Sequence, residues 1–147
     1  MKRVIFFVQM RRHVRASTHR LSSALLGLAL VVILLPLSAA AAPMMDYSKQ
    51  AFADAQNADK PIVVFVHAGW CVTCRKQQPV LKQLTTDPAF DSLVVFVVDY
   101  DKDKQTLREL NVTDRSTLVA FKGKTERQRS SFVTDPAKIR ALFESAL

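Results

Sequence analysis

The stretch Ile62-Val63-Val64-Phe65-Val66-His67-Ala68-Gly69-Trp70-Cys71-Val72-Thr73-Cys74 decides the fold of this chain. The run from Ile62 to His67 is apolar up to its last residue and does not alternate, which predicts a central strand covered on both faces. A helix is predicted to begin at Cys71 and to continue to about Leu84, with its apolar residues on one side. The two cysteines therefore stand where a buried strand gives way to a helix.

Cys71 and Cys74 are the only cysteines of the chain. A disulfide that serves stability gains most when it closes a long loop, and a bond between these two residues would close almost none. A pair with this spacing between a strand and a helix is typical of redox sites. The pair therefore predicts reversible disulfide chemistry rather than a structural bond.

The remaining elements follow from hydrophobic periodicity and from turn residues. We predict helices over residues 46–58, 71–84, 104–110 and from Asp135 onward, and strands over residues 62–67, 93–98, 117–121 and 128–133. The first two strands should be parallel neighbours joined by a right-handed crossover, and Gly123 should form the hairpin turn between the last two. This order predicts one α/β domain over residues 46–147, with a central mixed β-sheet flanked by helices on both faces.

The positive charge of the chain is concentrated at its amino-terminal end. The net charge is +8, and six of the 21 Lys and Arg residues lie within residues 1–41, where no acidic residue occurs. The other 15 stand against all 13 acidic residues, so the rest of the chain is nearly balanced. The overall basicity is therefore no sign of a nucleic-acid partner, and none is predicted.

Residues 1–41 have the three parts of a secretory signal peptide: a basic part up to Arg20, an apolar part over residues 21–35, and a run of small residues. We expect cleavage after Ala40 or Ala41. The alternative is an uncleaved N-terminal anchor in the inner membrane, because the uncharged stretch is long enough for a bilayer that needs about 20 apolar residues. Either way the domain is expected in the periplasm, where disulfides persist.

Three parts of the sequence resemble the thioredoxin superfamily: Trp70 to Cys74 after a strand, Pro79 in the helix that follows, and Thr117 to Gly123 in a later strand. The cysteine sequence is similar to that of the C-terminal domain of the bacterial thiol:disulfide interchange protein. The resemblance implies a thioredoxin-like fold and thiol–disulfide exchange with the thiols or disulfides of other proteins. It also implies a redox-active disulfide that needs no further cofactor, and it makes a membrane electron donor a candidate partner.

The resemblance assigns a role to each cysteine. Cys71 should lie exposed at the amino terminus of its helix, where unpaired N–H groups and the helix dipole lower the pKa of a thiol. It is therefore expected to act as the nucleophile, and Cys74, one turn further along, to resolve the mixed disulfide. Trp70, Ser116 and Thr117 are expected to line the substrate groove.

Two residues depart from the family pattern. Ser116 stands where a cis-proline is usual, and Phe65 stands where many members bury an acidic residue that takes up the proton of the second cysteine. A cis bond before a residue other than proline costs about 2.5–4 kcal/mol, so the Arg115–Ser116 bond is expected to be trans. Without the acid, His67 or water becomes the candidate proton shuttle, unless His67 only fills space at the end of its strand.

The leading prediction is an exported thiol–disulfide oxidoreductase that reduces or relays disulfides of envelope proteins. Two other functions remain open. A pair of soft thiolates suits copper(I), and Ser116 in place of a proline ring opens a coordination position, so a thiolate metal carrier is one alternative. Zinc would need two further ligands, and only His67 remains after the leader, so no metal ligands are assigned. The other alternative is an adaptor that binds a protein through its altered groove without turnover.

Overall fold

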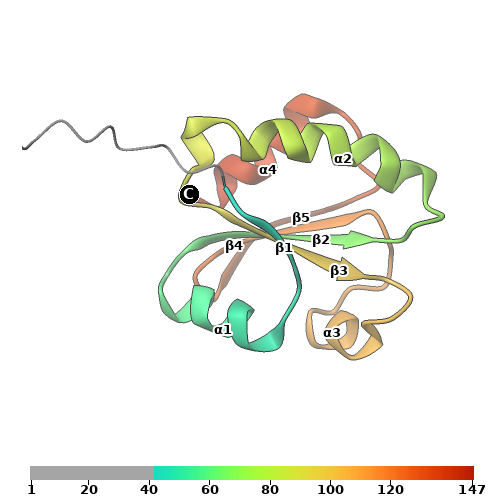
Figure 1. The fold of residues 1–147 in the computed structure, drawn as a ribbon, viewed down its shortest axis with the longest axis horizontal. Coiled ribbons are helices and arrows are strands. Elements are labelled where there is room, and N and C mark those ends of the chain that lie inside the picture. Colours follow the sequence, from blue (N-terminus) through green and yellow to red (C-terminus); the bar gives the residue numbers. More distant parts are fainter. Residues whose placement is uncertain (1–41) are drawn as a thin grey trace, which may run out of the picture. The chain divides into compact units, whose positions relative to one another are not determined.

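The computed structural model describes residues 42–147, so the predicted signal peptide (residues 1–41) lies outside the described residues. Figure 1 shows a central sheet with helices on both of its faces, which confirms the predicted fold class. The elements are, in chain order, β1 (Met44–Asp46), α1 (Lys49–Asn57), β2 (Pro61–His67), α2 (Val72–Thr85), a short 3-10 helix (Pro88–Phe90), β3 (Val94–Asp99), α3 (Lys104–Glu109), β4 (Thr117–Lys122), β5 (Thr125–Ser131) and α4 (Pro136–Ser145). No helix within residues 42–147 has the length and apolar character to cross a membrane.

Strand β2 occupies the centre of the sheet, whose strand order is β1-β3-β2-β4-β5. It runs parallel to β3, as predicted, and antiparallel to β4. Its side chains alternate between two cores, with Val63 and Phe65 on one side and Ile62 and Val64 on the other. Because both sides are buried, the strand reads as one continuous apolar run in the sequence.

Helices α2 and α4 cover one face of the sheet, and α1 and α3 cover the other (Figure 1). We call the cluster under α2 and α4 the cysteine-side core, because it contains both cysteines. It also contains Val63, Phe65, Leu81, Phe90, Leu93, Leu118, Ile139, Leu142 and Phe143. We call the cluster under α1 and α3 the distal core, which contains Phe52, Ile62, Val64, Val66, Phe96, Leu107, Val119 and Phe121.

The amino-terminal end of the domain differs from the prediction. Residues Met44–Asp46 form a fifth strand, β1, which pairs in parallel with β3 at one edge of the sheet. The helix predicted to begin at residue 46 begins at Lys49, because the Ser48 side chain caps it and accepts a hydrogen bond from the N–H of Ala51 at 3.1 Å. A strand of three residues is too short to show a period, so the sequence did not reveal it.

Strand β5 forms the other edge of the sheet and starts earlier than predicted, at Thr125 rather than residue 128. It is polar and largely exposed, so no apolar alternation marked its true limits. Gly123 forms the turn before it, as predicted, with a φ of 52°. A Cβ atom there would lie 3.2 Å from both Asp59 Cα and the Gln56 carbonyl oxygen, so the backbone around this turn favours glycine.

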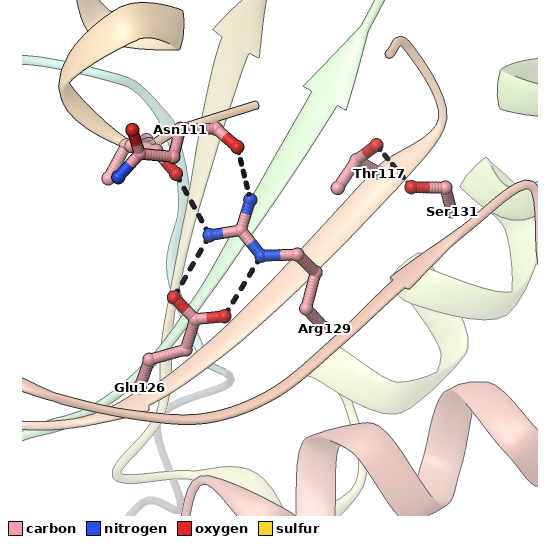
Figure 2. A network of polar contacts seen from close by, with 6 residues as sticks. Asn111, Thr117, Glu126, Arg129 and Ser131 are labelled. Carbon is pink, nitrogen blue, oxygen red and sulfur yellow. Dashed lines mark hydrogen bonds and ion pairs between the residues drawn. The ribbon is translucent and has the colours of Figure 1, made fainter. Parts of the chain in front are cut away.

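Arg129 links β5 to the end of α3 through hydrogen bonds (Figure 2). Its Nε and Nη2 donate to the two carboxylate oxygens of Glu126 at 2.9 Å each. Its Nη1 and Nη2 donate to the carbonyl oxygens of Asn111 and Leu110 at 2.8 Å each. The guanidinium therefore fixes the start of the connection that leads from α3 to Ser116.

Candidate active site

The two cysteines lie at the start of α2. Cys71 is the N-cap residue of this helix, and its Sγ accepts a hydrogen bond from the N–H of Cys74 at 3.1 Å. The N–H of Cys71 donates to the carbonyl of Ala68 at 3.0 Å, which closes the loop from β2. The two-residue spacing therefore makes one sulfur the cap of the helix and places the other one turn inside it.

Ser116 lies against both sulfurs. Its Oγ is 2.9 Å from Cys71 Sγ and 3.1 Å from Cys74 Sγ, and the residue is completely buried. A hydroxyl can donate one hydrogen bond and accept another. The Ser116 hydroxyl is therefore placed to accept from one sulfur while it donates to the other.

The backbone of Ser116 is strained and held on both sides. The Arg115–Ser116 bond is trans, as expected, since residues 42–147 contain no cis peptide. Ser116 instead has a left-handed conformation with a φ of 58°, which costs a residue with a Cβ about 1–3 kcal/mol. Its N–H donates to the carbonyl of Val66 at 2.8 Å, and its carbonyl accepts from the N–H of Phe132 at 3.0 Å. These bonds tie Ser116 to β2 and to the residue after β5.

Gln77 completes the anchoring of Ser116. It is fully buried in α2, and its Nε2 donates to the carbonyl oxygens of Ser116 at 3.1 Å and Val133 at 2.8 Å. Our sequence analysis missed this residue. Its spacing before Leu81 and Leu84 places it on the buried face of α2, and a polar side chain on that face was the available signal.

The pKa values of the two thiols are shifted in opposite directions. Burial raises the pKa of Cys71, but hydrogen bonds to its sulfur outweigh this effect and hold the pKa below that of an ordinary thiol. The donors are the Cys74 thiol, the Ser116 hydroxyl and the N–H groups of Cys74 and Thr73. Burial raises the pKa of Cys74, and the hydrogen bond to Cys71 raises it further, against a lowering effect of Ser116. The site therefore favours a thiolate at Cys71 beside a neutral thiol at Cys74.

Cys71 is less exposed than the sequence suggested, and this expectation was wrong. Only 3% of the residue is accessible, because its sulfur packs into the cysteine-side core against Ser116. Its chain neighbours Trp70 and Val72 are 57% and 58% exposed. These two side chains therefore present far more surface at this position than the sulfur between them.

Trp70 and Phe132 are exposed and form a cluster with the half-buried Arg115. The centre of the Arg115 guanidinium lies 5.0 Å from the centroid of the Trp70 ring and 5.6 Å from that of Phe132. The indole N–H donates to Asp101 Oδ2 at 2.9 Å, which fixes the orientation of the ring. The cluster presents apolar and cationic surface directly beside Ser116 and the two sulfurs.

Two other predicted site residues make hydrogen bonds to groups other than the sulfurs. His67 Nε2 lies 3.1 Å from Gln78 Nε2, and no hydrogen bond in the described part of the chain joins His67 to a sulfur. Thr117 Oγ1 donates to the carbonyl of Asp114 at 2.7 Å and lies 2.8 Å from Ser131 Oγ (Figure 2). Because Ser116 and Thr117 are both buried, Trp70 is the one predicted groove residue that presents surface.

Apart from Ser116 and Gln77, the cluster that contains the sulfurs consists of apolar residues. Phe65 packs in the cysteine-side core, so a phenyl ring fills the position where many family members bury an acid. Within residues 42–147, no group of three or more His, Cys, Asp and Glu side chains is arranged to hold a metal ion. Ser116 Oγ is thus the protic side-chain group that the structure brings to the dithiol.

A dithiol that caps a helix after a central strand, in a mixed sheet with helices on both faces, is the arrangement of a thioredoxin-like dithiol site. The family model for thioredoxin matches residues 43–144, and the chain belongs to the thioredoxin family. This membership confirms the resemblance seen in the sequence.

Individual relatives agree with this assignment. Thioredoxin from Mycobacterium tuberculosis (strain H37Rv) is 36% identical over 69 residues, which cover 47% of this chain and 59% of that protein. The crystal structure of Trxlp from Edwardsiella tarda EIB202 is 35% identical, with a TM-score of 0.66, over 67% of this chain and 97% of that one. Malassezia sympodialis thioredoxin superimposes with a TM-score of 0.63 at 26% identity, over 71% of this chain and 95% of that one. The chain thus spans about three-fifths of the length of the mycobacterial relative that it matches.

Proposed function

We propose that this protein is an exported thiol–disulfide oxidoreductase that reduces disulfides of other proteins in the bacterial envelope. The observation that carries the proposal is the asymmetry of the dithiol: Cys71 is stabilised as a thiolate at a helix terminus, while Cys74 is kept as a buried thiol. Thiol–disulfide exchange needs one thiolate to attack and a second, protected thiol to resolve.

The reaction begins when Cys71 attacks one sulfur of a substrate disulfide. The substrate S–S bond breaks, one substrate sulfur leaves as a thiolate and takes a proton from water, and a mixed disulfide forms between Cys71 and the other sulfur. Cys74 then loses its proton and attacks Cys71. The mixed disulfide breaks, the second substrate thiol leaves, and the enzyme is left with a Cys71–Cys74 disulfide.

Substrates are proposed to dock on the exposed surface around Cys71. Trp70, Val72 and Phe132 supply apolar area there, and the Arg115 guanidinium lies 5.0 and 5.6 Å from the centroids of the two aromatic rings. Aromatic side chains supply large contact areas at protein interfaces. A protein segment that carries the substrate disulfide is the ligand that suits this surface, because Cys71 itself offers little accessible area.

The export part of the proposal rests on residues 1–41, whose basic, apolar and small-residue parts have the pattern of a signal peptide. In the periplasm the oxidised enzyme must be reduced again after each turnover, and a membrane protein with a dithiol is the proposed electron donor. The Cys71–Cys74 dithiol would then relay electrons from that donor to envelope proteins.

Insulin reduction tests the activity. The wild type should accelerate precipitation of insulin chains by dithiothreitol, the Cys71→Ala variant should be inactive, and Cys74→Ala should accumulate a mixed disulfide that mass spectrometry detects. Activity that survives the loss of Cys71 would disprove the oxidoreductase assignment. An inactive wild type would turn attention to the metal-carrier and adaptor alternatives.

Cell fractionation of the full chain tests the export. We expect a periplasmic protein whose intact mass corresponds to cleavage after Ala40 or Ala41. A full-length protein in the inner-membrane fraction would favour the anchor, and a full-length cytoplasmic protein would contradict export in either form.

A further inference from the structure

We propose that the Ser116 hydroxyl is a catalytic group that carries the proton of Cys74 when this thiol resolves the mixed disulfide. The inference rests on the proposed function and adds a step to its mechanism. It assigns to a serine the task that the family usually gives to a buried acid.

Cys74 needs a proton acceptor that the core around it does not otherwise offer. The residue is completely buried, and its sulfur can attack only as a thiolate. Phe65 fills the position of the usual acid, and His67 is directed to Gln78. Burial and the hydrogen bond to Cys71 raise the pKa of Cys74, so unassisted ionisation is disfavoured.

Ser116 is the group in contact with Cys74 that can both accept and release a proton. Apart from Cys71, the polar atoms near Cys74 Sγ in the described chain include Ser116 Oγ at 3.1 Å, the carbonyl oxygen of Val66 at 3.9 Å and the backbone N–H of Ala68, which can only donate. A carbonyl can accept a hydrogen bond but has no proton to pass on. The same Ser116 Oγ lies 2.9 Å from Cys71 Sγ, the atom that holds the substrate sulfur in the mixed disulfide.

The relay balances in protons and electrons. In one concerted step the Cys74 proton moves to Ser116 Oγ, and the hydroxyl proton of Ser116 moves to the leaving substrate sulfur. The Cys74 sulfur forms a bond to Cys71 Sγ as the bond from Cys71 to the substrate breaks. Ser116 ends as a neutral hydroxyl, the substrate leaves as a thiol, and two electrons have passed from the dithiol to the substrate.

The backbone around Ser116 fixes the hydroxyl in this position. Its left-handed conformation is held by Val66 and Phe132, and Gln77 donates to its carbonyl. Strained backbone of this kind persists where the surrounding structure over-determines it, which is common at active sites. A serine that only filled space would need neither the strain nor contact with both sulfurs.

Rapid mixing of the reduced protein with glutathione disulfide, followed by acid quench and mass spectrometry, separates the attack step from the resolving step. We expect the glutathione mixed disulfide to accumulate in Ser116→Ala and Ser116→Gly, with resolution slowed by about 10²-fold, the lower range for loss of general acid–base catalysis. Glycine adopts the left-handed conformation freely, so this second variant keeps the backbone if alanine disturbs it. Ser131→Ala, which removes a hydroxyl of β5 that touches neither sulfur, should resolve like the wild type.

Two further readouts distinguish a relay from a structural role. Resolution in the Ser116 variants should accelerate with rising pH as Cys74 ionises unaided, whereas the wild type should depend less on pH. The defect should shrink when the leaving group is thionitrobenzoate, since this acidic aromatic thiol needs no proton to leave.

Unchanged resolution rates in both Ser116 variants would overturn the relay. So would slow resolution in Ser116→Ala together with a wild-type rate in Ser116→Gly, because that pattern would trace the effect to backbone strain. In either case wild-type attack and resolution would leave the proposed oxidoreductase function intact. A wild type that forms neither the mixed nor the internal disulfide would overturn both.

Discussion

The two faces of the central sheet bury different kinds of side chain. In the distal core the Phe52 ring lies 5.7 Å from both Phe96 and Phe121 in edge-on contacts, and every buried member of that cluster is apolar. The face under α2 and α4 is also packed with apolar residues, but there the buried polar residues Gln77 and Ser116 lie beside the cysteines.

Because of this difference, the distal face mainly determines the stability of the domain, whereas the cysteine side also determines the chemistry of the dithiol. The distal core depends mainly on volume and shape complementarity. The buried polar residue that β4 places on that face, Thr117, has its hydroxyl paired with the carbonyl of Asp114 and with Ser131. The cysteine-side core must hold a thiolate, a thiol and a hydroxyl at fixed distances. Substitutions on the two faces should therefore differ in the property they change, stability or the chemistry of the dithiol, as well as in the size of the effect.

The largest expected effect on stability comes from the distal core. Phe96→Ala should lower the free energy of unfolding by about 3–5 kcal/mol, because it removes a buried ring and leaves a cavity. Denaturant titration measures this loss. The Cys71–Cys74 reduction potential of the folded fraction should stay at the wild-type value, and a shifted potential would show that the two faces are coupled.

Gln77→Met should affect both stability and the site. It should lower the free energy of unfolding by about 1–3 kcal/mol, because it leaves buried carbonyl groups with fewer donors. It should also raise the Cys71 pKa toward that of an ordinary thiol, since Ser116 loses one of its anchors. Thiolate absorbance against pH measures the pKa, with Gln78→Met as the matched control. Equal behaviour of the two variants would contradict the anchoring role.

The opposite pKa shifts of the cysteines predict how the reduction potential depends on pH. At a pH below the Cys71 pKa, reduction of the disulfide takes up two protons, so the reduction potential should fall by about 59 mV per pH unit. Between the Cys71 and Cys74 pKa values, reduction takes up one proton, so the potential should fall by about 30 mV per pH unit. Ser116→Ala should move the break to higher pH, because it removes a hydrogen bond that lowers the Cys71 pKa. Titration against glutathione over a range of pH gives the slopes. A single slope up to the pH where free thiols ionise would rule out the lowered Cys71 pKa.

The smallest effect is expected at the start of α1, on the distal side. Ser48→Ala removes the side-chain cap of this helix and should cost about 1 kcal/mol of unfolding free energy. Thermal and denaturant unfolding measure the change, and insulin reduction should continue at the wild-type rate. A Ser48→Asp variant, which keeps an acceptor at the cap, should recover the stability.

The sequence was sufficient for the parts of the fold that have strong local signals. The continuous apolar run of β2 and the cysteine spacing after it predicted the central strand, the helix α2 and their connection. Strand β1 was missed because three residues carry no period, and β5 was misplaced because its exposed polar residues do not alternate.

The candidate site was predicted less completely, because its geometry depends on contacts between distant segments. The sequence indicated that Ser116 replaces a proline, but its left-handed backbone depends on Val66, Phe132 and Gln77, which come from three other parts of the chain. The low exposure of Cys71 likewise follows from packing against Ser116, 45 residues away. Local patterns do not encode such contacts.

The two edge strands determine how this sheet meets other polypeptides. β1 offers only three residues to a neighbouring strand, and β5 carries Glu126, Arg127 and Arg129 beside a register shift at Ala120/Phe121 in its pairing with β4. Short, charged or irregular edges deny an incoming strand the flat apolar template on which intermolecular β-sheets grow. The sheet is therefore protected at both ends against edge-to-edge aggregation, even though its interior strands are among the most apolar segments of the domain.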